Sequence, residues 1–290
     1  MKRETWQQHA QIINDALYYM YHYLDSDITL EQLAKASAVT PHHFHRIFKE
    51  QLQESFYHKL QSIRLQKAAN LLITNHFSSI SEIANLCGYA SHSSFIRVFK
   101  ERFTLTPSAW RKGGYKEYSH INISHSPYLN MQCDFSHLEP RIEKSEAIQI
   151  GYLRHKGYKR SIKEIWQKLH AYCLEADMSL PRQIGIHHDN PSIVPLDECA
   201  YVAGIELDEH SPLNKKLSTF TIPKSLCAVF YYKGEYGEVL NLIRHIYHAW
   251  LPKSGYEAKT LPPYVIYHKN HFLDPEEVFE LDFYLPIKVI

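Results

Sequence analysis

The sequence predicts a multidomain protein, in which an all-α tandem helix-turn-helix domain is followed by an α+β domain of two pseudo-repeated β-α-β-β units. Three observations predict this fold class. A pattern of helix, tight turn and helix occurs twice, with the copies about 50 residues apart. After Gly113-Gly114, polar and β-prone residues replace the helical spacing of apolar residues. A strand–helix–strand–strand pattern then occurs twice.

The clearest helix-turn-helix pattern lies between Ser79 and Trp110. Ser79 and Glu82 form a capping-box signal for a first helix, and Gly88 suits a turn that needs positive φ. Ser91 is placed to cap a second helix. One side of this helix carries Phe95, Val98 and Phe99, and the other side carries His92, Ser93, Ile96 and Arg97. A packed aromatic back and a basic front are features that reading a DNA major groove requires.

The same pattern appears earlier, from Thr29 to Lys49, where Thr29 and Gln32 form the matching capping box. The offset is 50 residues before the turn and 51 after it, so the second turn has one extra residue. Arg46 matches Arg97. We expect the phenylalanines of both units to be core residues and not stacking platforms; they are Phe44, Phe48, Phe95 and Phe99. Two copies in register are a far stronger signal than one.

Two further helices complete this half. The segment 6–23 has apolar residues at helical spacing and should pack across the first unit. A helix over about 55–72 joins the two units. A rigid connection of this kind would set the distance between the two reading helices. If both read one face of a duplex, they must lie about 34 Å apart, which is one turn of DNA.

The second half predicts one curved antiparallel sheet with two helices on one face. The halves echo each other in the segments 155–158 and 232–236. The first unit consists of a strand over 147–155, a helix over 161–178, and strands over 183–187 and 199–207. The second consists of a strand over 226–233, a helix over 236–251, and strands over 264–269 and 278–287.

Charge and composition narrow the function classes. The first 115 residues hold 13 Lys and Arg against 9 Asp and Glu, a balance of +4, whereas residues 116–290 hold 19 against 22, a balance of −3. This split suggests that only the first half faces nucleic acid. Five scattered cysteines without a CxxC motif argue against a disulfide framework or a zinc-thiolate site. No apolar run approaches the roughly 20 residues of a membrane span, so we expect a cytoplasmic protein with no membrane partner.

Residues 9–112 resemble the DNA-binding domain of AraC/XylS-type transcription regulators. The residues that carry the resemblance are Ile83-Ala84, Cys87-Gly88-Tyr89, Ser94-Phe95, Arg97, Phe99-Lys100 and Thr106-Pro107, together with the joining helix from Phe56 to Leu72. The resemblance implies double-stranded DNA as a partner. We therefore expect a DNA-binding domain over 1–112, a linker over 113–130 and a second domain over 131–290.

The resemblance also places the base-facing positions, which fall at His42, His45 and Arg46 in the first unit and at His92, Ser93, Ile96 and Arg97 in the second. Arg46 and Arg97 would grip either guanine or a phosphate. The histidines of the first helix replace the larger or amide groups that are common in the family. They either read bases or contact only phosphate and water. A metal site at His42 and His45 lacks a third ligand nearby, so we expect none.

Residues from about 125 to 290 resemble the GyrI-like effector-binding domain that follows the DNA-binding part of some AraC-type regulators. The matching residues are Gly185-Ile186 with Asp189 to Pro191, Lys233-Gly234-Glu235-Tyr236, Trp250-Leu251-Pro252, Ser254-Gly255-Tyr256-Glu257, Leu281-Asp282-Phe283 and Leu285-Pro286. The resemblance implies a small-molecule effector, often amphipathic or cationic, in a groove between the pseudo-repeats. We expect no other cofactor.

One departure from this family concerns charge. Many members carry a glutamate near the penultimate strand that pairs with a cationic ligand, and we place that position at Val265. Glu206 is a candidate substitute, or else a strand-end residue in water. The full set of candidate effector residues is Tyr152, Trp166, Tyr201, Glu206, Tyr231, Tyr264, Tyr267 and Phe283, which either line an apolar site or belong to the core.

The sequence therefore predicts a sequence-specific DNA-binding transcription regulator with a small-molecule effector, and not an enzyme. Two alternatives concern the second domain. It is a hydrolase if a buried carboxylate with an aromatic partner lies in its groove. It is a protein-docking module, with RNA polymerase as the candidate partner, if the groove is closed and filled.

Overall fold

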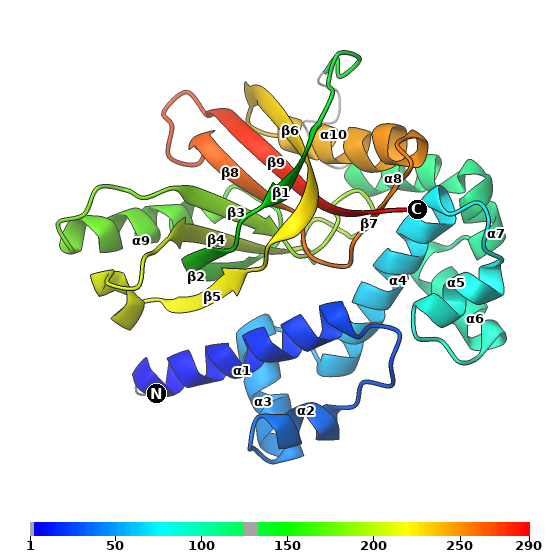
Figure 1. Ribbon diagram of the computed structural model, residues 1–290, viewed down its shortest axis with the longest axis horizontal. Helices are drawn as coiled ribbons and strands as arrows, with labels where there is room; N and C mark the ends of the chain where they lie inside the picture. Colours follow the sequence, from blue (N-terminus) through cyan, green and yellow to red (C-terminus); the bar gives the residue numbers. More distant parts are fainter. Residues whose placement is uncertain (1–2, 125–132) are drawn as a thin grey trace. The chain divides into compact units, whose positions relative to one another are not determined.

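The computed structural model describes residues 3–124 and 133–290 (Figure 1). The chain divides into two compact units, one ending at Tyr118 and the other covering Ser119–Val289. The division falls inside the segment 113–130, and residues 125–132 of that segment lie outside the described residues.

The first helix-turn-helix unit consists of α1 (Arg3–His22), α2 (Leu30–Ala36) and α3 (Pro41–Leu52). The predicted capping box is present, because the Thr29 side chain accepts from the Gln32 backbone and the Gln32 side chain accepts from the Thr29 backbone. Thr40 caps α3 with a single hydrogen bond, which its side chain accepts from His43 N. The turn between α2 and α3 places Ala38 at φ 53°, in the left-handed region.

The second unit repeats this construction with α5 (Ile80–Leu86) and α6 (His92–Phe103). The Ser79–Glu82 capping box and the Ser91 cap are both confirmed. Gly88 lies in the turn at φ 76°, as predicted. A side chain at Gly88 would also have no room, because an added Cβ would lie 2.5 Å from the carbonyl oxygen of Leu24 and 2.7 Å from Arg64 Nη2.

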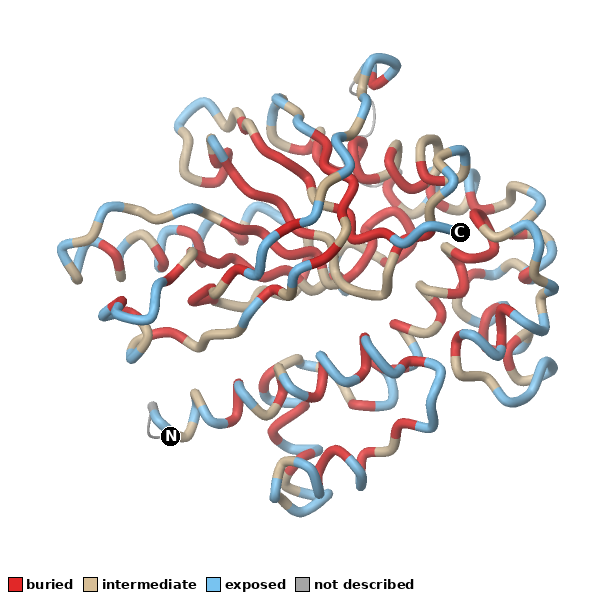
Figure 2. The backbone as a smooth tube through the Cα atoms, viewed as in Figure 1, coloured by how far each residue is buried: buried red, intermediate tan, exposed pale blue. Residues whose placement is uncertain are grey.

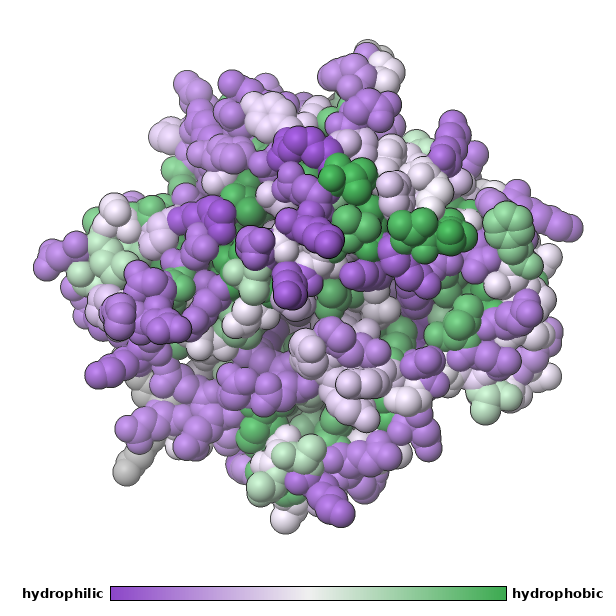
Figure 3. All heavy atoms as spheres, in the orientation of Figure 1, coloured by the Kyte–Doolittle hydropathy of each residue, from purple (hydrophilic) through white to green (hydrophobic). Residues whose placement is uncertain are grey.

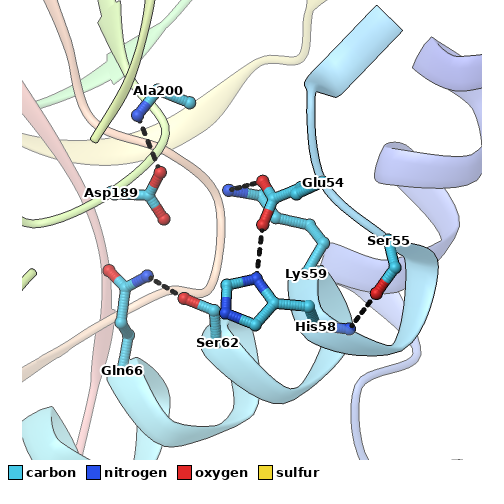
Figure 4. A network of polar contacts seen from close by, with 8 residues as sticks. All are labelled: Glu54, Ser55, His58, Lys59, Ser62, Gln66, Asp189 and Ala200. Carbon is cyan, nitrogen blue, oxygen red and sulfur yellow. Dashed lines mark hydrogen bonds and ion pairs between the residues drawn. The ribbon is translucent and has the colours of Figure 1, made fainter. Parts of the chain in front are cut away.

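Helix α4 (Phe56–Thr74) connects the two units, begins at the cap Ser55 and contacts both α3 and α5. Its Arg64 donates to the carbonyl oxygens of Leu24 (3.3 Å) and Ser26 (2.8 Å), so it holds the loop that precedes α2. Figure 4 shows its N-terminal end, where Glu54 bonds to His58 and also lies 3.4 Å from the buried Lys59 ammonium. These contacts at the N-terminal end and in the middle of α4 fix the helix against the first unit.

The helical region continues further than the sequence predicts. After α7 (Pro107–Ala109) come a π-helical turn, η1 (Trp110–Gly114), and helix α8 (Tyr115–Ser124). We expected a non-helical linker from residue 113, and for 115–124 that expectation is wrong. Tertiary packing overrides the weak local signal: the rings of Tyr115 and Tyr118 lie 6.2 and 5.3 Å from Trp110, which is fully buried.

The second unit contains one antiparallel sheet in the order β1-β6-β9-β8-β3-β4-β2-β5, with β7 paired to β9. The strands are β1 (Arg141–Ser145), β2 (Ile148–Lys156), β3 (Gln183–His187), β4 (Ala200–Glu206), β5 (Ser218–Ile222), β6 (Ser225–Glu235), β7 (Tyr256–Ala258), β8 (Tyr264–Lys269) and β9 (Val278–Val289). The two pseudo-repeats meet where β3 pairs with β8. The predicted α+β fold of two β-α-β-β units is confirmed.

Helices α9 (Ile162–Glu175) and α10 (Glu238–His245) pack on one face of this sheet, where their apolar side chains share a core with every second strand residue. A π-helical turn, η3 (Ile246–Trp250), and a short 3₁₀ turn, η4 (Leu251–Lys253), extend α10, and another 3₁₀ turn, η2 (Pro212–Lys215), precedes β5. Figure 2 shows buried residues running through the central strands. The opposite face carries a second, smaller apolar cluster on β2, β3, β4, β5 and β8.

The surface seen in Figure 3 mixes hydrophilic residues with small apolar groups, as is usual for globular proteins. Among the residues that the structure describes, no helix combines the length and apolar composition that a membrane crossing requires.

Candidate functional sites

Helix α3 presents a polar front over an aromatic back. His42, His45 and Arg46 are exposed, whereas Phe44 and Phe48 are completely buried. The two phenylalanine rings lie 5.9 Å apart and both contact Phe56 at the start of α4. The packing of the back orients the front, because a helix held by its buried stripe cannot rotate without exposing that stripe.

Helix α6 repeats this arrangement. His92, Ser93 and Arg97 are exposed and Ile96 is half-buried. Phe95 and Phe99 are completely buried, and further rings extend the packing towards Trp110. The expectation that all four phenylalanines are core residues is confirmed. The structure therefore leaves the predicted DNA-facing residues of both units accessible on one side of each helix.

The two arginines have different neighbours. Arg46 Nη2 lies 3.1 Å from His43 Nδ1, one turn earlier on the same helix. Arg97 Nη1 instead donates to Glu101 Oε1 at 3.1 Å, one turn later. Both side chains of the second pair are more than half exposed, so this ion pair contributes little to stability and can be exchanged for a phosphate.

His9 and His43 were not among the residues that we predicted to face DNA. His9 of α1 is buried behind α3, and its ring meets the His43 ring edge-on at 5.5 Å. Burial and the neighbouring His43 lower the pKa of His9, and among the described residues its Nδ1 has no hydrogen-bond partner. The helical position of His9, on the same side as Ile13, was the signal that could have placed it inside.

The eight candidate effector residues fall on both faces of the sheet. Trp166, Tyr201, Tyr267 and Phe283 lie on the face that α9 and α10 cover. The other four, Tyr152, Glu206, Tyr231 and Tyr264, alternate with residues of that face and point to the opposite side. A single site cannot include both sets.

The residues under the helices form a connected group of rings. Trp166 Nε1 donates to the Tyr201 hydroxyl at 3.3 Å, and that hydroxyl lies 3.4 Å from the Tyr267 hydroxyl. The rings of Trp166 and Tyr267 meet at 90° with centroids 5.7 Å apart. Val265 is fully buried on the same face, paired with Gly185 on one side and Phe283 on the other. Burial raises the pKa of Tyr201 and Tyr267, so both hydroxyls stay protonated.

Two histidines that the sequence did not single out complete this group. His187 at the end of β3 contacts the rings of Tyr201 (5.5 Å) and Phe283 (5.9 Å). His271, after β8, lies 5.8 Å from the Tyr267 ring. Burial lowers the pKa of each histidine to about 3, so both rings are neutral at physiological pH. We call these six residues the ring cluster: Trp166, His187, Tyr201, Tyr267, His271 and Phe283.

The opposite face has a different character. Tyr264 stacks in parallel on Tyr284 at 4.7 Å, and the Arg154 guanidinium lies over Tyr152 at 5.0 Å. Glu206 stands at the strand end in an ion pair with Arg182, with atom distances of 2.8 and 2.9 Å. The structure therefore places Glu206 at the surface, away from the ring cluster and in the position of a strand-end residue in water. The Tyr231 hydroxyl donates to Glu280 and the ring is half exposed.

Within the described ranges, no three His, Cys, Asp or Glu side chains are grouped so that they could hold a metal ion. All five cysteines are free thiols.

Together, the tandem helix-turn-helix domain and the two-repeat α+β domain define a DNA-binding protein with a ligand-binding module. Residues 33–113 match a helix-turn-helix domain family. Residues 138–288, just over half of the chain, match the GyrI-like small molecule binding domain. The chain belongs to the GyrI-like family and carries an AraC-type DNA-binding domain before it, so both family expectations are confirmed.

Similar proteins match the first domain. The xylose operon regulatory protein of Escherichia coli (strain K12) is 31% identical over 96 residues, which are 33% of this chain and 24% of that protein. The transposon Tn10 TetD protein of Escherichia coli is 35% identical over 107 residues, 37% of this chain and 76% of that protein. A crystal structure of an AraC-type transcriptional regulator from Chromobacterium violaceum covers 35% of this chain and 90% of its own, with 24% identity and a TM-score of 0.33. The chain thus spans about a quarter of the xylose regulator.

Proposed function

We propose that this protein is a transcription regulator, not an enzyme, that reads duplex DNA with α3 and α6 in successive major grooves. One observation carries the proposal. In both units the second helix turns a mostly polar, exposed face outwards, with His42, His45 and Arg46 on α3 and His92, Ser93 and Arg97 on α6, while the phenylalanines behind these faces are fully buried. Repetition of a polar front on a packed back is what two half-site readers joined by α4 require. The basic balance of this half supports the same partner.

The test is site selection from random duplexes with the purified full chain at a stated salt concentration, followed by binding measurements on variants. Arg97→Ala and Arg46→Ala should each weaken binding to the selected site by about 1–3 kcal/mol if they read bases. Lys168 lies on the exposed side of α9, so Lys168→Ala removes one positive charge from the other domain and should leave DNA affinity unchanged. Equal weakening on selected and random duplexes would show that the arginines hold only phosphate.

We further propose that the second domain binds its effector at the ring cluster and not on the opposite face of the sheet. Trp166, Tyr201, Tyr267 and Phe283 meet there with two neutral histidines, which offers stacking surfaces and a few hydrogen-bonding groups in an apolar setting. The predicted residues of the other face, such as Glu206 and Tyr231, already have partners at the surface.

A matched pair of substitutions separates the two faces. Once a thermal-shift screen has found a ligand, Tyr201→Phe should weaken its binding, because it removes a hydroxyl inside the ring cluster. Tyr231→Phe removes the same atom from the opposite face and should leave affinity unchanged. The reverse result would move the site to the other face. If the protein regulates transcription, we expect RNA polymerase as a further partner and a cytoplasmic location.

A further inference from the structure

Two tyrosines at the rim contact the histidines of the ring cluster. Tyr158 precedes α9 and Tyr236 precedes α10, so they come from equivalent turns of the two repeats, next to Gly157 (φ 92°) and Gly237 (φ 98°). Both tyrosines are only half-buried, unlike the rings beneath them. Tyr158 stacks on His187 at 5.3 Å and its hydroxyl bonds to Nδ1 of that ring. Tyr236 meets His271 edge-on at 5.4 Å.

The charges at this rim compensate each other. The Arg160 guanidinium lies over the Tyr236 ring at 4.7 Å and forms an ion pair with Glu277, whose backbone oxygen accepts the Tyr236 N–H. A ligand that passes between the two tyrosines therefore meets no uncompensated charge from this pair.

The buried carboxylates of this domain all lie in other interactions. Among the described residues they are Asp189, Glu257 and Asp282. Asp189 accepts the backbone N–H of Ala200, as Figure 4 shows. Glu257 lies 2.7 Å from the Lys288 ammonium. Asp282 is on the opposite face, between Arg141 and His268. The ring cluster itself holds aromatic rings and neutral imidazoles, and none of its six members is charged at neutral pH.

Among the described residues, one polar atom of the ring cluster lacks a hydrogen-bond partner. His271 is 3% exposed and touches the rings of Tyr236, Tyr267, Phe272 and Phe279. Its Nδ1 has no hydrogen-bond partner among the described residues. A buried polar atom of this kind normally has a protein or water partner, so the orphan points to a bound molecule that supplies one.

We infer that the effector is an uncharged, planar ring compound that enters as Tyr158 and Tyr236 move aside and shares a hydrogen bond with His271 Nδ1. The inference rests on the proposed effector function and names its ligand class. A cation or an anion would lose its hydration without gaining a counter-charge inside the cluster. An uncharged ring loses little on entering and gains stacking contacts with the surrounding aromatic residues.

The test compares acridine with 10-methylacridinium, in which an N-methyl group adds a fixed positive charge and blocks the ring nitrogen as a hydrogen-bond acceptor; the preference for acridine that remains in His271→Phe reports the charge alone. Binding to the full chain is measured by thermal shift and by titration at slightly alkaline pH, where acridine is neutral. The wild type should bind acridine at least about ten-fold more tightly than the cation. Equal or tighter binding of the cation would overturn the inference while leaving the effector function in place. If neither compound nor any other member of a panel of such pairs binds, the effector function itself fails.

Val265→Glu tests the charge argument in the opposite direction. Val265 is buried beside the Tyr201 hydroxyl, since a Cβ added at Gly185 would meet both side chains. A carboxylate at this position should reverse the preference, so that 10-methylacridinium binds more tightly than acridine. Glutamine has nearly the same shape as glutamate but no charge, so Val265→Gln should not reverse the preference for acridine. The wild-type comparison tests the inference even if Val265→Glu does not fold.

His271→Phe tests the hydrogen bond. Because Nδ1 has no partner in the free protein, this variant should melt at the same temperature as the wild type or higher. It should nevertheless lose about ten-fold in acridine affinity. A purely structural histidine would give the opposite combination, with lower stability and unchanged affinity, and that result would overturn the role of His271.

Discussion

Ala38 and Gly88 occupy the same position in the two helix-turn-helix turns, and exchanging their residue types should have opposite effects on stability. Both have left-handed backbone, at φ 53° and φ 76°. Ala38 therefore carries strain that glycine would not. Gly88 lies against the Leu24 carbonyl and the Arg64 guanidinium, so alanine there adds both strain and a collision.

The magnitudes follow from these contacts. Left-handed backbone costs an L-residue about 1–2 kcal/mol, and the extra freedom of glycine in the unfolded chain offsets about 0.4–1 kcal/mol of that. Ala38→Gly should thus stabilise its unit by about 0.5 kcal/mol. Gly88→Ala should cost about 1 kcal/mol in strain and about 2 kcal/mol more if Arg64 gives up a charged hydrogen bond to Leu24 or Ser26. The expected total is about 3 kcal/mol.

Hydrogen exchange of the full-length chain, read separately on α2–α3 and on α5–α6, measures both effects without assuming two-state unfolding of a two-domain protein. The reasoning is refuted if Gly88→Ala costs less than about 1 kcal/mol, or if Ala38→Gly destabilises its unit by more than about 1 kcal/mol. Lys168→Ala in the other domain serves as the control and should leave exchange in both helix pairs unchanged.

Three further outcomes are expected. Glu101→Gln releases Arg97 from its ion pair and removes a negative charge, so DNA affinity should rise about two- to ten-fold at low salt; unchanged affinity would mean that Arg97 does not touch DNA. Burial lowers the pKa of His187 and His271 to about 3 in the folded protein, below the value of 6.5 for a free histidine. The unfolded chain therefore takes up protons first, so the free energy of unfolding is highest above pH 6.5 and falls as the pH drops towards 3. Calorimetry should show that the free energy of unfolding falls by about 2 kcal/mol between roughly pH 7 and 5.5, and that this loss is halved in His271→Phe. A loss of the same size in the variant would show that His271 does not contribute to the pH dependence. Asn122→Ala removes two hydrogen bonds to carbonyls of the loop after β3 and should speed exchange in α8 by about ten-fold; unaltered exchange would contradict their role.

The first domain could be predicted in detail because its signals are local. Capping residues such as Ser79 and Thr29 act on backbone groups three residues away, and the phenylalanines of α6 follow the helical period of a packed stripe. The strands of the sheet centre were also predictable, and β3 and β8 begin and end at the predicted residues. These central strands hold mostly apolar residues between polar ends, so their signal stands out from their surroundings.

The elements that the sequence did not reveal have weak local signals. Strands β1 and β5 are the two edges of the sheet, with one neighbour each and many polar residues, and β7 has only three residues. Helix α8 lacks a clear apolar period and depends on Trp110, which lies outside it. Such segments take their structure from partners that are distant in the sequence or belong to another element.

By itself the sequence determined the order of the main helices and central strands, the two-repeat construction of both domains and the residues that face outwards on α3 and α6. Only the tertiary structure decided which aromatic residues meet. Tyr201 and Tyr264 are both buried tyrosines on central strands, yet they lie on opposite faces of the sheet. It also brought His187 and His271 together from strand ends 84 residues apart in the sequence. The physical reason is that neighbouring strand residues point to opposite faces, and a site on one face is assembled by strand pairing that no local pattern specifies.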